Sequence, residues 1–296
     1  MIRIGVDIGG TKMVIAAFDP SGAEIFRRRS DAPNGEYPDA VRSLADAVLG
    51  AEREVGKACT VGVGTPGAAS ADGVLRNAYA SVLNEKPLKR DLERLLSREV
   101  RLANDANCFA LSETVDGAAA GARVVFGVIL GTGVGGGVVV DGRALAGRNA
   151  IAGEWGHNAL PWIRSDELPG PRCGCGREGH IEAFLSGPAL AHDLKRASGV
   201  ALEPAQIVSR AESGDAACET ALARYEERLA RALASVINLL DPDAIVLGGG
   251  LSNAERLYRN VPKLWGPYVY SDSVATPLLK AKHGDASGVR GAARLW

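Results

Sequence analysis

Short apolar runs separated by glycine turns dominate the first thirty residues. We expect strands at residues 2–7, 12–19 and 23–29, because each run is bounded by glycine, proline or serine. Residues 38–55 change the period, since apolar side chains there recur at helical spacing. The opening therefore predicts a three-strand meander followed by an amphipathic helix.

The middle of the chain predicts two further strands. One covers residues 60–64 and runs into a Thr-Pro-Gly turn, and the other covers residues 100–103. The second strand meets Asn104-Asp105, where Asp105 is a candidate N-cap for a helix through residues 110–115. The end of the chain predicts a long helix at 218–240, a strand at 244–247, a glycine run at 248–250 and a short helix at 288–296.

The opening pattern returns after a small-residue segment at 117–121. A strand at 126–130, a glycine-rich turn at 131–137 and a strand at 138–142 repeat the strand, turn and strand of the N-terminus. A long-period repeat of this kind indicates two copies of one supersecondary plan. We therefore expect two similar α/β lobes with a cleft between them.

Composition and charge exclude several classes of protein. The 296 residues are 46% hydrophobic and 23% charged, as in globular proteins, and 34 basic against 35 acidic residues give no strong field for nucleic acid. The N-terminus does not have the pattern of a signal peptide, and no apolar run is long enough to span a membrane. With five cysteines and no disulfide pattern, we expect a cytoplasmic protein that binds neither nucleic acid nor membrane.

The first glycine turn has the composition of a phosphate site. Residues 5–12 nearly match a P-loop, but they end Gly-Thr-Lys and lead into a strand, so a P-loop is rejected. Backbone N–H groups of Gly9 and Gly10, with the Thr11 hydroxyl and the Asp7 carboxylate, suit a phosphate with Mg²⁺. An ordinary tight turn beside a buried acid is the alternative. Two more glycine turns, at 131–137 and 248–250, favour a triphosphate held by the duplicated fold.

Six motifs in order carry a family resemblance over nearly the whole length. They are residues 7–12 (Asp-Ile-Gly-Gly-Thr-Lys), 64–67 (Gly-Thr-Pro-Gly), 103–107 (Ala-Asn-Asp-Ala-Asn), 131–137, 153–157 (Gly-Glu-Trp-Gly-His) and 173–182. Together they resemble the actin-like ATPase superfamily and, within it, the ROK family of repressors, open reading frames and sugar kinases. The resemblance implies an α/β, two-lobed actin-like ATPase (ribonuclease H-like) fold with duplicated β-hairpin units. It implies a small lobe at 1–117, completed by a C-terminal helix at about 285–296, and a large lobe at 118–284.

The resemblance also implies a phosphoryl transfer site. From the residues alone, Asp105 has equal weight as a helix cap and as the base that takes a hydroxyl proton; the resemblance favours the base. Asp7 would help hold Mg²⁺ through water. The expected sugar ligands are Gly67, Asn77, Asn104, Asp105, Glu154, His157 and Glu182. The expected ATP ligands are Asp7, Gly9, Gly10, Thr11, Lys12, Thr132 and Gly133 at the phosphates and Gly248 and Gly249 at adenosine.

Two histidines and two cysteines predict a structural zinc site. His157, Cys173, Cys175 and His180 supply four nitrogen and sulfur ligands, which complete a tetrahedral Zn²⁺ and leave no open position. The family pattern has a third cysteine where this chain has His180. Histidine is an acceptable zinc ligand with a different reach.

The expected reaction is transfer of the γ-phosphate of Mg·ATP to the 6-hydroxyl of a hexose. Residues 74–88 and 160–172 resemble the fructokinase branch most, which favours fructose, although residues 77–80 and 83–85 depart from that branch. Glucokinase, mannokinase and N-acetylglucosamine kinase are the alternatives. A non-enzymatic sugar sensor is a further alternative, but ROK repressors carry a helix-turn-helix before the glycine hairpin, and here Asp7 stands near the start. The resemblance implies a homodimer.

Overall fold

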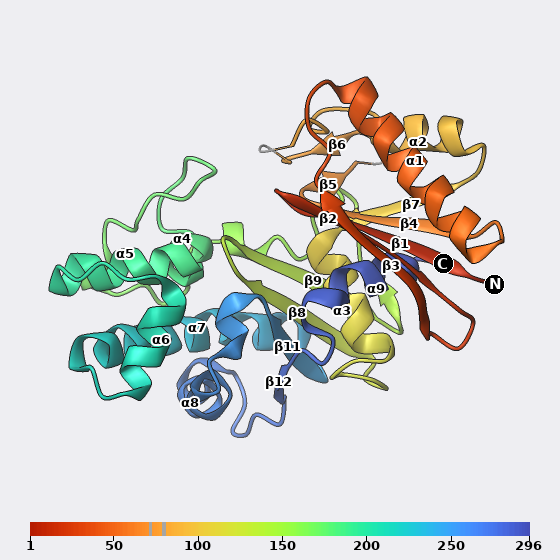
Figure 1. The fold of residues 1–296 in the computed structure, drawn as a ribbon. Helices are drawn as coiled ribbons and strands as arrows, with labels where there is room; N and C mark the ends of the chain where they lie inside the picture. The colour runs from red at the N-terminus through yellow and green to blue at the C-terminus, as the bar shows by residue number, and fades with distance from the viewer. Residues whose placement is uncertain (71–72, 79–80) are drawn as a thin grey trace.

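The computed structural model describes residues 1–70, 73–78 and 81–296, and these form two five-stranded mixed sheets (Figure 1). The first sheet has the order β3-β2-β1-β4-β7. Its meander of β1, β2 and β3 is antiparallel, whereas β4 and β7 run parallel to β1. The strands are β1 (Arg3–Ile8), β2 (Lys12–Phe18), β3 (Glu24–Asp31), β4 (Thr60–Thr65) and β7 (Val100–Asn104).

The second sheet repeats this arrangement, with the order β10-β9-β8-β11-β12. An antiparallel hairpin, β8 and β9, lies on one side, and the parallel strands β11 and β12 lie on the other. The strands are β8 (Val124–Leu130), β9 (Val134–Val140), β10 (Arg143–Ala144), β11 (Ala244–Gly248) and β12 (Leu278–Lys280). The shared plan of the two sheets supports the predicted duplication. A separate pair of short strands, β5 (Ala68–Ala69) and β6 (Leu75–Arg76), follows β4.

The outer face of each sheet is covered by amphipathic helices. Ile4, Val6 and Ile8 of β1 pack with α1 (Tyr37–Val55) and α2 (Leu88–Leu96) in one buried cluster. On the second sheet, β8 packs with the helices of the large lobe in another cluster. These helices are α4 (Ile181–Leu185), α5 (Gly187–Ser198), α6 (Pro204–Glu212), α7 (Ala216–Leu240) and α8 (Arg256–Leu264).

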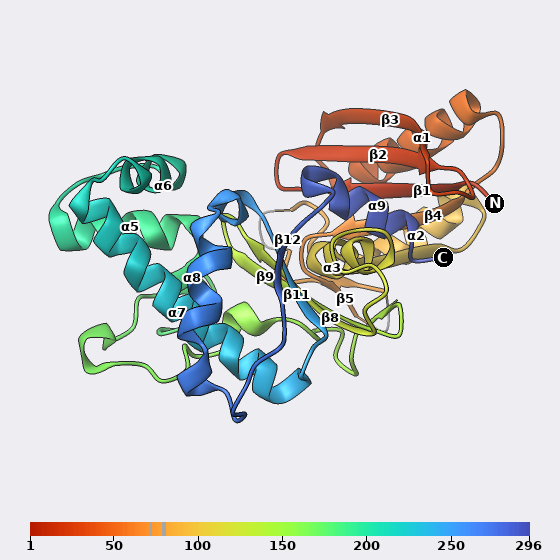
Figure 2. The ribbon, with the colours of Figure 1, turned by 90° about the horizontal axis from the view of Figure 1, so that it is seen from below.

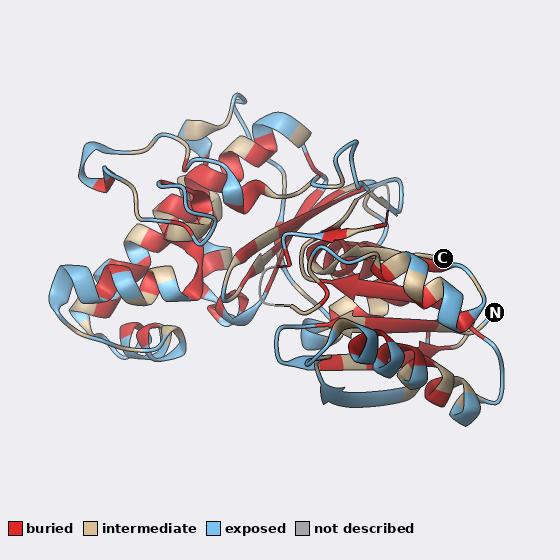
Figure 3. Ribbon diagram, turned by 90° about the horizontal axis from the view of Figure 1, so that it is seen from above, coloured by how far each residue is buried: buried red, intermediate tan, exposed pale blue. Residues whose placement is uncertain are grey.

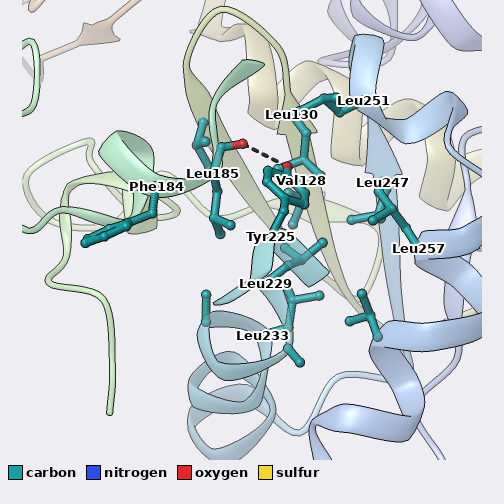
Figure 4. Packing of buried hydrophobic residues seen from close by; sticks show 14 of the residues in the cluster. Val128, Leu130, Phe184, Leu185, Tyr225, Leu229, Leu233, Leu247, Leu251 and Leu257 are labelled. Atoms are coloured by element: carbon teal, nitrogen blue, oxygen red, sulfur yellow. Dashed lines mark hydrogen bonds between the residues drawn. The ribbon is translucent and has the colours of Figure 1, made fainter. Parts of the chain in front are cut away.

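Helix α7 is the centre of the large-lobe core. Tyr225, Leu229 and Leu233 point from it toward β8 and β11, and the Tyr225 hydroxyl donates a hydrogen bond of 2.8 Å to the carbonyl of Leu185 (Figure 4). In the ribbon of Figure 3, buried residues are concentrated on the central strands and on one side of each helix, and exposed residues lie mainly in the loops and on the outer sides of the helices. This core fixes α4 and α5 relative to the sheet.

Two helices lie between the inner faces of the two sheets (Figure 2). They are α3 (Asp105–Val115) and α9 (Ser287–Ala293). A Cβ at Gly5 would lie 1.9 Å from the Val289 carbonyl oxygen, and one at Gly127 would lie 2.7 Å from the Cβ of Ala110. Glycine is therefore required where α9 approaches the first sheet and α3 the second. Helix α3 also packs against the sheet of the large lobe, so both lobes share it. The lobe boundary between residues 117 and 118 stays a prediction, and it would assign α3 to the small lobe.

The start of α3 corrects one prediction. The helix begins at Asp105 itself, and the N-cap is Asn104, one residue before the expected cap. The Asn104 side-chain oxygen accepts the backbone N–H of Ala106 at 2.9 Å. The capping role therefore falls mainly to the asparagine, which leaves the aspartate at the first position of the helix.

Within the described residues, no helix is both long enough and apolar enough to cross a membrane.

Candidate active site

The first glycine hairpin connects β1 and β2. The N–H of Gly9 donates to the Lys12 carbonyl at 2.8 Å, and the Lys12 ammonium pairs with Asp31. The alternation along β1 sends Val6 and Ile8 to the outer core and Asp7 to the inner face. There a Cβ on Gly288 of α9 would lie 2.3 Å from Asp7 Oδ2, so only glycine fits. The carboxylate of Asp7 is thus held under the hairpin, against the C-terminal helix.

Asn104 ties the start of α3 to the turn after β4. Its Nδ2 donates to the Gly67 carbonyl at 2.9 Å while its Oδ1 caps the helix. Gly67 has φ +74°, and a Cβ there would lie 2.2 Å from the Arg76 carbonyl, so this turn requires glycine. The next residue, Asp105, accepts the Ala106 N–H at 2.8 Å. Three of the predicted sugar residues, Gly67, Asn104 and Asp105, are therefore brought together.

The two inner carboxylates hold protons more tightly than ordinary aspartates. Burial, with a smaller contribution from the charge of Asp105, raises the pKa of Asp7 to about 7. Burial, with a smaller contribution from Glu154, raises the pKa of Asp105 to about 6. A carboxylate with a pKa near 6 is ionised at neutral pH and is a better proton acceptor than one in water.

The second glycine hairpin connects β8 and β9 at the edge of a large cavity. Gly131 N–H donates to the Gly133 carbonyl at 3.0 Å, which closes the turn. The cavity beside it has a volume of about 940 Å³. Its lining includes Gly131 and Thr132, residues of α5 and α6, and Leu251 and Asn253 after β11. Leu130 and Leu251, also in the lining, lie side by side in Figure 4.

Sequence reasoning did not find the α5 and α6 wall of this cavity. Pro188, Pro204 and Val208 carry no motif, and only the tertiary fold brings them to the hairpin. The cavity reaches Gly250, whereas Gly248 and Gly249 are packed against Phe109 and Leu130. The assignment of Gly248 and Gly249 to adenosine remains a prediction.

The Gly-Glu-Trp-Gly-His motif lies on a 3-10 turn, η1 (Trp155–His157), beside β9. Trp155 Nε1 donates to the Gly135 carbonyl at 3.1 Å, which attaches this turn to the second hairpin. Burial raises the pKa of Glu154, which also feels the charges of His157 and Glu182. Three predicted sugar residues of the large lobe, Glu154, His157 and Glu182, therefore lie near one another. The charge of Glu154 also contributes to the raised pKa of Asp105.

Asn77 lies against Gly67, since a Cβ at Gly67 would lie 3.0 Å from the Asn77 carbonyl carbon, and it lines a second cavity. This cavity of about 290 Å³ is lined by Gly9, Gly10, Pro33, Pro66, Asn77 and their neighbours. Asn84 is used structurally, because its Oδ1 accepts the Ala78 N–H at 2.9 Å. Residues 79 and 80, where the chain departs from the fructokinase pattern, lie outside the described residues.

The predicted metal ligands form one cluster. The ligand atoms of His157, Cys173, Cys175 and His180 all lie within 4.8 Å of one another. The sulfur-to-nitrogen distances are 3.7 Å from Cys173 to His157 and 3.3 Å from Cys175 to His180. Tetrahedral Zn²⁺ separates such ligands by about 3.6 Å. Burial lowers the pKa of His180, which favours the neutral imidazole that binds a metal. The four residues fit zinc.

Solved structures with the same architecture include two sugar kinases. The ROK hexokinase of Thermus thermophilus superposes with a TM-score of 0.89 at 34% identity, over 100% of this chain and 97% of that chain. The ROK family glucokinase of Streptomyces griseus, solved with glucose and AMPPNP, gives 0.80 at 28% identity, over 100% and 99%. These likenesses confirm the predicted two-lobed, actin-like ATPase fold.

The amino-acid sequence gives the family. The ROK family model matches residues 3–296. An N-acetyl-D-glucosamine kinase of Pectobacterium atrosepticum is 40% identical over 98% of this chain and 97% of that protein, and one of Photobacterium profundum is 38% identical over 98% of each. The chain belongs to the ROK family, as the six motifs predicted.

Proposed function

We propose that this ATP-dependent sugar kinase of the ROK family transfers the γ-phosphate of ATP to the 6-hydroxyl of N-acetyl-D-glucosamine. The observation that carries the choice of sugar is the 40% identity to an N-acetyl-D-glucosamine kinase over 98% of the chain. The likeness extends through every element that supplies a site residue. It replaces our expectation of fructose with one of the alternatives, because the fructokinase-like stretches cover only a small part of the chain.

Asp105 is the base in this proposal. The sugar hydroxyl would lie beside its carboxylate, and the hydroxyl oxygen would attack the γ-phosphorus as the proton passes to Asp105 and ADP leaves. Asn104, fixed by its two hydrogen bonds at the head of α3, would orient the same part of the sugar. Glu154, His157 and Glu182 would bind sugar hydroxyls from the large lobe. Since Asp105 follows β7 of the first sheet and Glu154 precedes η1 beside β9 of the second sheet, the sugar would contact both lobes.

The two hairpins would bind ATP. Gly9, Gly10, Thr11 and Lys12 would contact the phosphates from the small lobe and Thr132 and Gly133 from the large lobe. The 940 Å³ cavity beside Thr132 has room for a nucleoside. Asp7 would help to hold Mg²⁺, which supplies charge neutralisation of the phosphates. Binding between two lobes excludes water, so that the γ-phosphate of ATP is transferred to the sugar and not to water.

The acid limb of the pH profile tests the base. We expect kcat/KM for the sugar to fall at least about tenfold per pH unit below the pKa of Asp105, which is about 6, because Asp7, with a pKa of about 7, is protonated over the same range. The direction follows from the chemistry, because protonation at low pH removes the acceptor of the hydroxyl proton. Initial rates in a coupled ADP assay between pH 5 and 8 give the profile. A flat profile down to pH 5 would contradict the assignment.

A panel of sugars tests the acceptor. We expect N-acetyl-D-glucosamine to have a kcat/KM at least about 10²-fold above that of fructose, since a site built to bind a substrate polar group discriminates strongly against analogues that lack it. Glucose, mannose and N-acetylmannosamine complete the panel in the same ADP assay. A preference for fructose or glucose would overturn the choice of sugar while leaving the kinase activity in place.

The homodimer remains a proposal, supported by an exposed apolar patch beside the end of α7. Its residues are Trp162, Leu239, Tyr268 and Tyr270, and Leu239 and Tyr270 are 82% and 99% exposed. The rings of Trp162 and Tyr268 contact each other at a tilt of 45°, with centroids 5.1 Å apart, and Asn238 hydrogen-bonds to the backbone of Tyr268 and Tyr270. Exposed patches of this kind mark association surfaces. The molecular mass in solution tests this proposal.

A further inference from the structure

The segment from α4 to the start of α5 forms hydrogen bonds with the second glycine hairpin at two points. Glu182 Oε2 accepts the backbone N–H of Val134 at 3.0 Å, where β9 leaves the turn. Five residues later, the N–H of Gly187 donates to the Gly131 carbonyl at 2.8 Å, where β8 enters the turn. Both ends of the turn that carries Thr132 are thus bonded to one short stretch of chain.

Glu182 is closely fitted to this turn. A Cβ at Gly133 would lie 2.6 Å from Glu182 Oε2, so glycine is needed there for the carboxylate to reach the Val134 N–H. Val134 is buried, with 5% of its surface exposed. A buried N–H without an acceptor is costly, so the turn depends on this carboxylate for its conformation. The other oxygen, Oε1, accepts the Cys173 thiol at 3.4 Å.

We propose that Glu182 is a positioning residue for ATP: it holds the second hairpin in the conformation that binds the phosphates, whether or not a sugar is present. This goes beyond the sugar-binding role given to Glu182 above, and it rests on the proposed binding of ATP phosphates at Thr132 and Gly133. The carboxylate acts through the backbone of Val134 and does not touch the nucleotide. Preorganisation of the turn lowers the ordering cost of nucleotide binding.

Glu154 provides a matched control. It is another partly buried carboxylate of the large lobe that is assigned to the sugar, and it feels the charge of Glu182. Among the described residues, Glu182 accepts a hydrogen bond from the hairpin backbone, and Glu154 does not. A residue that only binds sugar should behave like Glu154 when nucleotide affinity is measured without sugar.

The acceptor oxygen and the negative charge of Glu182 should have opposite effects on nucleotide affinity. The negative charge repels the phosphates, whereas the acceptor oxygen orders the turn that binds them. Glu182→Gln keeps an acceptor oxygen and removes the charge, and Glu182→Met keeps the length of the side chain and removes both. We expect the Met variant to bind nucleotide about 10-fold more weakly, and the Gln variant to bind it as well as the unchanged protein or better.

The experiment is calorimetric titration of the full-length protein with Mg·AMPPNP in the absence of sugar. Glu154→Met should change the dissociation constant by less than about 2-fold, since it leaves the hairpin bonds in place. Equal affinity of the Glu182→Met and unchanged proteins would overturn the proposal, and so would tighter binding by both Glu182 variants. If the unchanged protein bound no AMPPNP, the kinase assignment would fail instead, which keeps the two failures distinct.

Hydrogen exchange of the unchanged protein gives a second measurement that does not depend on the folding of a variant. The amide of Val134 should be protected when neither nucleotide nor sugar is bound, because it donates a hydrogen bond to Glu182. Protection should be lost in Glu182→Met and retained in Glu154→Met. An unprotected Val134 amide in the unchanged protein would overturn the proposal directly.

Discussion

Asp105→Asn is expected to lower kcat by roughly 10²- to 10⁴-fold, the range for loss of a general base. The asparagine has the same shape, and its oxygen can still accept the Ala106 N–H that Asp105 accepts now. It cannot take the proton of the sugar hydroxyl. Sugar affinity, measured by calorimetry without turnover, should therefore change little, and the loss should appear in kcat and not in binding.

The stability of the same variant provides the folding control. A buried aspartate with a raised pKa costs stability when ionised, so the cost appears as pH rises from the ordinary value of 3.8 through about 6. Asp105→Asn removes this ionisation, and its melting temperature at pH 8 should equal or exceed that of the unchanged protein. Asp39→Asn, on the exposed side of α1, is the matched variant and should leave kcat unchanged.

Nearly unchanged turnover in Asp105→Asn would remove this residue from the mechanism. Retained sugar binding without turnover even in the unchanged protein would instead favour the sugar sensor over the kinase. The two outcomes are distinguished because the sensor needs the sugar residues of both lobes but no base.

Cys175→Ala is expected to reduce zinc from about one ion per chain to well below one, and to raise the KM for sugar by about 10-fold or more. The thiol is exposed, so its removal leaves no cavity in the core. Loss of the metal would release His157 and the loop that leads to Glu182. Both of these residues are proposed to bind the sugar. Elemental analysis of the purified protein and initial rates at varied sugar measure the two effects.

Cys59→Ala is the matched variant for the metal. Cys59 is a buried thiol that packs in the small-lobe core, away from the four-ligand cluster. It should keep the full zinc content and the sugar KM. A metal-free preparation of the unchanged protein with full stability would disprove the four-ligand site, including the substitution of His180 for a third cysteine.

Local patterns explain why much of the fold was predictable. The alternation of β1 and the glycine turns around it are set by neighbours in the sequence, and α1 follows from apolar residues at helical spacing. The start of α3 was harder to predict, because Asn104 and Asp105 are both good caps and only the backbone geometry distinguishes them. The grouping of two histidines and two cysteines was predictable because the residue types that bind zinc are chemically restricted.

The tertiary structure decided the features that depend on distant residues meeting. The wall of the cavity beside the second hairpin, at Pro204 and Val208, carries no motif, because any small or apolar side chain can line such a surface. The hydrogen bond from the Val134 N–H to Glu182 joins residues 48 positions apart. The sequence predicted only that Glu182 would bind the sugar. Spacing in the sequence says nothing about such a contact.

The sequence by itself therefore determined the family, the duplicated sheets, the glycine hairpins and the four residues of the candidate metal site. Each of these is a short motif or a local period, and local conformational preference is enough to reveal it. Only the tertiary structure decided that Asp7 and Asp105 share one buried environment that raises the pKa of both. That outcome depends on α3 and α9 packing between the sheets, because desolvation is a property of the packed fold and not of any segment.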